Sequence, residues 1–124
     1  MIGYVTLGTN DLPRAAAFYD ALCKELGVGR MMEMETFIAW GKPGGGAGIG
    51  LTKPFDGKPA TVGNGVMVAF ECKTNADVDR VYAKAIALGA KDEGKAGPRM
   101  EGFYAGYFRD PDGNKLNAFC MSHG

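Results

Sequence analysis

The two halves of this chain repeat one pattern of residues at a spacing of about 63 positions, and this repeat constrains the fold more than any other feature. At that shift Tyr4 falls on Met67, and the Leu-Gly pair at 26–27 lies one residue away from the Leu-Gly pair at 88–89. Each half reads as a strand, a capped helix that ends in Leu-Gly, and then further strands. A chain of 124 residues has room for one domain, or for two small modules that share a core.

Hydrophobic periodicity and turn residues divide each half into elements. In the first half we expect a strand at 2–8, a helix capped by Asn10 or Asp11 that ends at Gly27, and strands at 30–35, 37–41 and 47–52. In the second half we expect a strand at 66–72, a helix from Thr74 or Asn75 to Gly89, a polar stretch at 91–102, a strand at 103–109, a turn at 110–114 and a strand at 115–121. Residues 54–63 hold two prolines and two glycines and no periodicity, which is typical of a linker. The sequence therefore predicts a first module at about 1–53, a linker at about 54–63 and a second module at about 64–121.

Charge and composition exclude several classes of function. Lys and Arg together number 14, as do Asp and Glu, so the chain lacks the basic surface that a nucleic-acid partner requires. No apolar run approaches the roughly 20 residues of a membrane span. The three cysteines are far apart and form no CxxC pair, which predicts reduced thiols and a cytoplasmic protein. The single histidine, His123, lies next to the end of the chain, where we expect no role in a site.

Four segments together carry a family resemblance. They are the first strand with its Asp-Leu cap at 5–12, the helix segment at 15–19, the strand at 65–70 and the Asp-Pro-Asp-Gly-Asn turn at 110–114. On these residues the chain resembles the vicinal oxygen chelate superfamily, which includes glyoxalase I, the extradiol dioxygenases, the fosfomycin-resistance enzymes and the bleomycin-resistance proteins. The resemblance implies an α+β fold of two tandem βαβββ modules, a curved sheet around a cup, and a homodimer.

In metal-using relatives, the resemblance implies one metal ligand on the first strand and one on the last strand of each module. These positions are occupied here by Tyr4, Gly50, Met67 and Asn117. A tyrosine keeps its proton at neutral pH, a thioether is a soft ligand, an amide is neutral, and glycine has no side chain. We therefore expect no divalent metal and no other cofactor. An amide at Asn117 also lacks the basicity that the usual glyoxalase I mechanism needs.

Strand alternation then predicts a cup lined by aromatic, methionine and a few polar side chains. The residues expected to contact a ligand are Tyr4, Thr6, Trp40, Met67, Arg99, Phe103, Tyr107, Asn117 and Phe119. Such a lining is typical of small-molecule sites. The main hypothesis is a protein that binds a small organic molecule, as the metal-free bleomycin-resistance proteins do.

Two other functions stay open at this point. The chain could be an enzyme, either a lyase or isomerase of glyoxalase type, a dioxygenase relative, or a metal-independent acid-base catalyst that uses Glu101 or Tyr104. It could also be a structural or partner-binding module whose cup is filled by its own side chains. Ligand binding in excess EDTA, metal content and a ligand screen separate the three.

Overall fold

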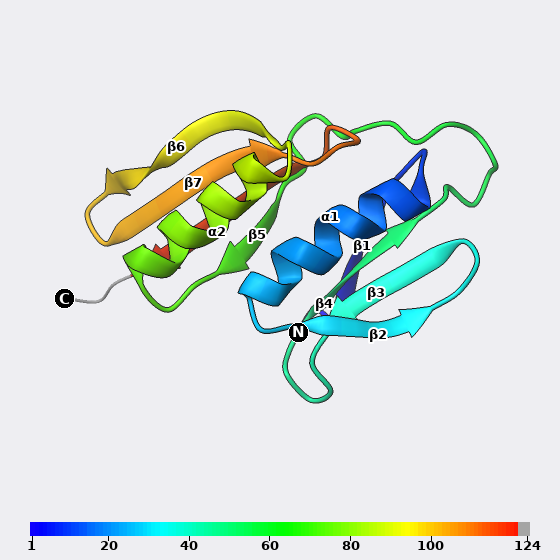
Figure 1. Cartoon of the computed structure of the whole chain (residues 1–124), viewed down its shortest axis with the longest axis horizontal. Helices are drawn as coiled ribbons and strands as arrows, with labels where there is room; N and C mark the ends of the chain where they lie inside the picture. The colour runs from blue at the N-terminus through cyan, green and yellow to red at the C-terminus, as the bar shows by residue number, and fades with distance from the viewer. Residues whose placement is uncertain (122–124) are drawn as a thin grey trace. The chain divides into compact units, whose positions relative to one another are not determined.

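A computed structural model of the chain describes residues 1–121, so the prediction for His123 lies outside the described residues. The chain separates into two compact units, Met1–Val62 and Gly63–Gly124. Each unit consists of a strand, a helix and three more strands, as Figure 1 shows. The predicted α+β fold of two tandem βαβββ modules is therefore confirmed. No helix in residues 1–121 has the length and apolar content needed to span a membrane.

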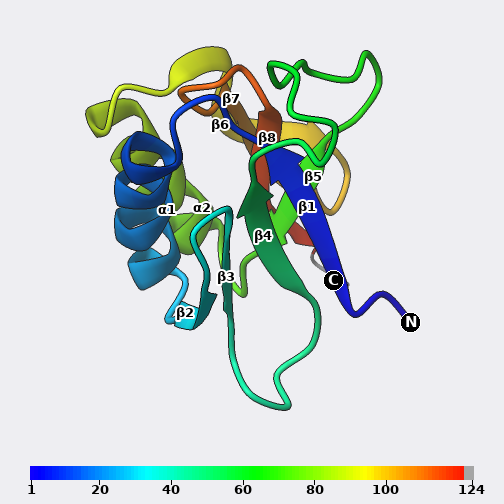
Figure 2. The same cartoon turned by 90° about the vertical axis from the view of Figure 1, so that its right-hand side faces the viewer.

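The first unit has one four-stranded sheet in the order β1-β4-β3-β2. Its elements are β1 (Tyr4–Gly8), α1 (Leu12–Glu25), β2 (Gly29–Glu33), β3 (Phe37–Gly41) and β4 (Gly48–Thr52). Strand β1 pairs with β4 in parallel, and the other pairs are antiparallel. Helix α1 lies along one side of this sheet, which is visible in Figure 2.

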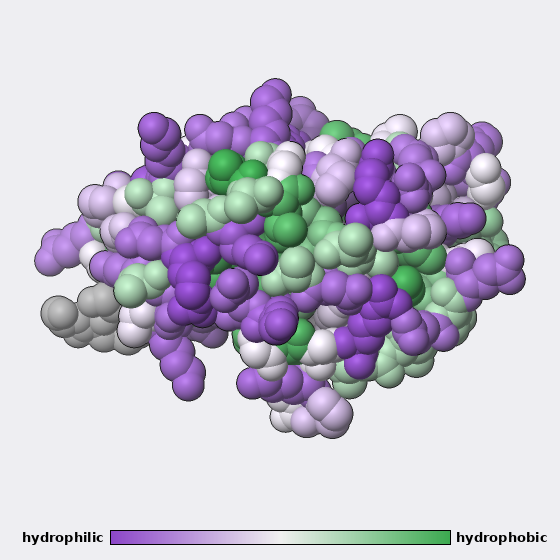
Figure 3. Space-filling view, in the orientation of Figure 1, coloured by the Kyte–Doolittle hydropathy of each residue, from purple (hydrophilic) through white to green (hydrophobic). Residues whose placement is uncertain are grey.

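The second unit repeats this arrangement in the order β5-β8-β7-β6. Its elements are β5 (Val68–Glu71), α2 (Asn75–Ala87), β6 (Lys91–Met100), β7 (Phe103–Arg109) and β8 (Lys115–Met121). Strand β5 pairs with β8 in parallel, and β6-β7 and β7-β8 are antiparallel. Val78, Val81 and Ala85 of α2 are buried, and the side of α2 that is visible in Figure 3 carries both hydrophilic and apolar side chains.

Local chemistry explains where the two helices begin and end. Asp11 caps α1 by accepting a hydrogen bond from the backbone N–H of Arg14, and Thr74 caps α2 by accepting one from the N–H of Asp77. Gly27 and Gly89 follow the helix ends with φ of 74° and 97°, a conformation in which glycine has no steric cost. The helices predicted from these residues are confirmed.

The predicted polar stretch at 91–102 was wrong in its main part, because residues 91–100 form strand β6. This strand lies at the edge of its sheet and pairs only with β7. Its register shifts between Asp92 and Gly94, again before Gly97, and again after Pro98. Glycine, proline and repeated register shifts destroy the alternation by which a strand is recognised in a sequence. The other strands agree with the prediction to within a few residues.

Each sheet has two faces, which we name by their relation to the helix of the same unit. The helix face packs against the helix and forms the core of the unit. Trp40 and Leu51 occupy it in the first unit, and Phe108 and Leu116 occupy it in the second. The distal face is the opposite face, and it carries the alternate residues of every strand. The residue positions that the family resemblance assigns to a site lie on the distal faces.

Candidate functional site

The distal face of the first unit is built from alternate residues of three strands. Tyr4 and Thr6 of β1 are exposed, while Leu7 is buried on the helix face. Gly50 of β4 pairs with Thr6 on one side and with Ala39 of β3 on the other. Tyr4 and Thr6 therefore lie on the face that strand alternation predicted.

A β-bulge in β2 places two methionines on this same face. Arg30 pairs with Trp40 and Met32 pairs with Ala39, so Met31 is an extra residue that opposes no partner. The sulfur of Met31 lies only 2.6 Å from where a Cβ on Gly41 would stand, and Gly41 shares the alternation of Ala39. Without the extra residue, consecutive residues of a strand would point to opposite faces.

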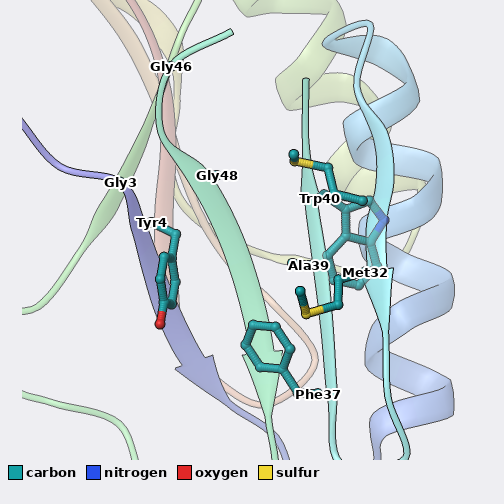
Figure 4. A pocket seen from close by; sticks show the side chains of 9 residues that line it. Gly3, Tyr4, Met32, Phe37, Ala39, Trp40, Gly46 and Gly48 are labelled. Atoms are coloured by element: carbon teal, nitrogen blue, oxygen red, sulfur yellow. The ribbon is translucent and has the colours of Figure 1, made fainter. Parts of the chain in front are cut away.

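These side chains surround a pocket of about 330 Å³, which lies within the first unit (Figure 4). The residues that line it are Gly3, Tyr4, Met31, Met32, Phe37, Ala39, Trp40, Gly46 and Gly48. The rings of Tyr4 and Phe37 meet edge to face with their centroids 6.5 Å apart. The volume and the apolar lining are typical of sites that hold a small organic molecule.

The charged residues Arg30 and Glu33, which flank the two pocket methionines in the sequence, point toward the helix face. Arg30 donates hydrogen bonds of 2.8 Å and 2.7 Å to the two carboxylate oxygens of Asp20 on α1, and it also pairs with Glu33. The Arg30 guanidinium lowers the pKa of Asp20, and the hydrogen bond from Trp40 Nε1 contributes in the same direction. The Arg30–Asp20 ion pair connects α1 with β2 and places both of these charged groups outside the pocket lining.

The metal-ligand positions of the first unit do not fit a divalent ion. Tyr4 is 66% exposed and offers a phenol. Gly50 has no side chain, and the ring of Phe37 covers it so closely that a Cβ there would stand 2.6 Å from the ring. A residue with a coordinating side chain at position 50 would displace Phe37. Among residues 1–121, no group of three His, Cys, Asp or Glu could hold a metal ion.

The two positions of the second unit also lack suitable donors. Asn117 of β8 lies between Ala69 of β5 and Tyr107 of β7 and is only 1% exposed. Its Oδ1 is buried and accepts no hydrogen bond. Met67 immediately precedes β5 and offers a thioether. A neutral amide oxygen beside a thioether is not a donor set for a hard or borderline divalent ion.

The distal face of the second unit brings together most of the other predicted residues. Phe103 and Phe119 stack with their centroids 5.8 Å apart. The guanidinium of Arg99 lies 5.4 Å from the ring centroid of Tyr107, and the amine of Lys115 lies 5.6 Å from the same centroid. Lys115 was not predicted, although its place two residues before Asn117 puts it on the same face.

Two predicted residues face the helix and not the distal face. The indole of Trp40 is 1% exposed, packs 5.7 Å from the ring of Tyr19 on α1, and donates to Asp20. Trp40 therefore borders the pocket from beneath, and its only side-chain donor is already used. The Tyr104 hydroxyl donates a 2.6 Å hydrogen bond to Asp79 on α2, which raises the pKa of Tyr104.

This placement bears on Glu101 and Tyr104, the two alternative acid-base residues considered from the sequence. Tyr104 belongs to β7 but turns toward α2, and Glu101 is exposed in the turn between β6 and β7. A phenol that already donates to a carboxylate and has a raised pKa is a poor general base at neutral pH.

Sequence reasoning missed Met31, Met32 and Ala39 as pocket residues. Phe37 and Ala39 follow from alternation once Trp40 is known to face α1. Met31 and Met32 could not be assigned, because a bulge has no consistent signal in a single sequence.

Two βαβββ modules whose distal faces carry the candidate residues define the vicinal oxygen chelate class of fold. A family model described as Glyoxalase/Bleomycin resistance protein/Dioxygenase superfamily matches residues 1–118. The chain therefore belongs to this superfamily, as the sequence resemblance indicated. None of the curated proteins matches the chain.

Solved structures agree with this assignment. A glyoxalase/bleomycin resistance protein from Albidiferax ferrireducens T118 is 34% identical, with a TM-score of 0.90 over 98% of this chain and 99% of the other. A lactoylglutathione lyase from Agrobacterium tumefaciens is 22% identical, with a TM-score of 0.73 over 97% of this chain and 92% of the other. A glyoxalase/bleomycin resistance protein/dioxygenase family enzyme from Burkholderia phytofirmans PsJN is 19% identical, with a TM-score of 0.77 over 97% and 98%. The last two similarities support the fold alone.

Proposed function

We propose that this protein binds a small organic molecule through its aromatic and methionine side chains, without a divalent metal. The observation that carries the proposal is the state of the four metal-ligand positions. Tyr4, Gly50, Met67 and Asn117 offer no anionic oxygen and no imidazole, and Phe37 covers the one position that has no side chain. A family scaffold with such positions has to hold its ligand by direct contacts.

The pocket of the first unit is the binding site we favour. Its volume of about 330 Å³ is at the lower end of the range for small-molecule sites, roughly 300–1,000 Å³. Exposed methionines beside aromatic rings form an adaptable apolar surface. We place the predicted contacts of Arg99, Phe103, Tyr107, Asn117 and Phe119 on the distal face of the second unit as additional candidates.

A thermal-shift screen of small organic compounds in excess EDTA tests the proposal. Compounds that bind only the folded protein raise its melting temperature. We expect compounds that raise it equally with EDTA and with added zinc, nickel or manganese. Binding that appears only with a divalent ion would overturn the proposal.

Substitution of one pocket residue tests whether the ligand binds in the pocket of the first unit. Phe37→Ala should weaken calorimetric binding of a screened compound by about tenfold or more, because it removes one aromatic wall. Phe55→Ala is the control, since Phe55 is a fully exposed phenylalanine outside the pocket. Equal affinities of the two variants would contradict the assignment of the site.

The homodimer and the cytoplasmic location belong to the same proposal. The three cysteines Cys23, Cys72 and Cys120 are free and buried, which suits a reducing compartment. Light scattering during size-exclusion chromatography should give a mass twice the chain mass of 13.1 kDa. A mass equal to one chain would contradict the dimer.

A further inference from the structure

The pocket of the first unit has no ionised side chain among its lining residues, all of which lie in the described part of the chain. Its side chains are two rings, two thioethers, one methyl group and the edge of an indole. The indole N–H is already donated to Asp20 at 2.9 Å. The hydroxyl of Tyr4 is therefore the only side-chain polar group that the pocket can offer to a ligand.

The bulge in β2 accounts for this absence of charge. The sequence around the two methionines is Arg30-Met31-Met32-Glu33, with a charged residue on each side. Because the bulge turns both methionines to the distal face, Arg30 and Glu33 both return to the helix face, where they pair with each other and Arg30 pairs with Asp20. In a regular strand, each face would carry one methionine and one charged residue of these four.

The walls of the pocket differ in chemistry. In Figure 4 the rings of Tyr4 and Phe37 lie on one side of the pocket and the thioether of Met32 lies on the other. Met31 and the small residue Ala39 also line the pocket. Sulfur and aromatic groups both make favourable contacts with an aromatic ring. An aromatic ring bound in this pocket would gain contacts from either kind of group.

We propose that this pocket selects uncharged aromatic molecules over those that carry a carboxylate or a phosphate group. The inference rests on the proposed function and adds the chemical class of the ligand. An anionic group placed against these walls loses hydration and gains no cationic partner, which is costly. An uncharged ring with one hydroxyl or carbonyl gains the contact with Tyr4.

Calorimetry with two probes on one scaffold tests the proposal at neutral pH in EDTA. The probes are 2-naphthol, which is neutral, and 2-naphthoate, which is anionic. We expect 2-naphthol to bind at least about tenfold more tightly than 2-naphthoate. Equal or tighter binding of 2-naphthoate overturns the charge selectivity and leaves the metal-independent function standing. Failure of both probes to bind overturns the selectivity for aromatic molecules, whereas the proposed function falls only if the thermal-shift screen also gives no compound that binds in EDTA.

A charge introduced into the pocket should reverse the preference. Met32→Lys adds a cation to one wall, so the affinity for 2-naphthoate should rise above that for 2-naphthol. Met34→Lys is the matched control, because Met34 is similarly exposed, lies two residues further along the chain and does not line this pocket. The same reversal in both variants would overturn the assignment to this pocket.

The Tyr4 hydroxyl is tested separately. Tyr4→Phe keeps the ring and removes the hydroxyl, so 2-naphthol should bind about threefold to tenfold more weakly. Naphthalene, which has no polar group, should bind both proteins equally. A loss that is the same for naphthalene and 2-naphthol would contradict a hydrogen-bonding role for Tyr4.

Discussion

Asn117 is a buried polar residue whose Oδ1 accepts no hydrogen bond. It lies in the middle of β8 with a neighbouring strand on each side, and only 1% of it is exposed. An unpaired buried polar group costs about 1–3 kcal/mol of stability. Residues with such a cost are found where a protein keeps a group for binding rather than for folding.

We therefore expect Asn117→Val to stabilise the protein by about 1 kcal/mol, because it removes the unpaired Oδ1 and adds a β-branched residue to a strand. Urea unfolding measures the change. Asn114→Val is the contrast, since the Asn114 amide donates a 2.9 Å hydrogen bond to Asp110 in the Asp110–Asn114 turn. The free energy of unfolding of Asn114→Val should be about 1–3 kcal/mol lower than that of the native sequence. A clear loss of stability in Asn117→Val would contradict this account of the residue.

At the scale of elements, Asp20 links α1 to β2 and β3, because it accepts hydrogen bonds from both Arg30 and Trp40. The pKa of Asp20 is lowered by these partners, the Arg30 hydrogen bond being the main cause. A carboxyl group whose pKa is lowered by folding stabilises the protein above its unfolded pKa of about 3.9, and this contribution is lost as the pH falls through the folded pKa.

The melting temperature of the native sequence should therefore fall more steeply between about pH 5 and pH 2 than that of Asp20→Asn. Arg30→Gln should flatten the profile in the same way, because it removes the main partner. The Asp20 side chain is 44% exposed, so solvent and salt reduce the size of the effect. Profiles of equal slope in the three proteins would show that the ion pair does not couple α1 to the sheet.

The bulge in β2 makes a second prediction at this scale. Deletion of Met31 leaves the pairs Arg30–Trp40 and Met32–Ala39 in place and restores a regular strand. The shortened protein should unfold at a urea concentration close to that of the native sequence. Its affinity for 2-naphthol should fall, because one wall of the pocket loses a thioether. Unchanged affinity would show that the bulge does not shape the pocket.

At the scale of the whole molecule, the sequence predicted those parts of the fold that depend on local chemistry. It predicted both helices from a cap at Asn10 or Asp11 and at Thr74 or Asn75 and from the glycine after each helix, and both were confirmed with Asp11 and Thr74 as the caps. Strand β6 was missed, because its pairing with β7 is irregular and depends on contacts that are remote in sequence.

In the candidate site too, residues placed by local alternation were predicted, and residues placed by contacts remote in sequence were not. Alternation placed Tyr4 and Thr6 correctly, because β1 is regular. Trp40 was predicted to contact a ligand, and its indole both packs on Tyr19 of α1 and borders the pocket. The pocket methionines depend on a bulge, which is decided by strand pairing and not by the residues themselves.

Calorimetric titration of zinc, nickel and manganese into the purified protein tests the central claim most directly. We expect no stoichiometric binding of any of the three ions, and no change in the affinity for 2-naphthol when EDTA replaces them. One equivalent of ion that binds tightly, is lost in Asn117→Val and is required for the binding of 2-naphthol would contradict the account.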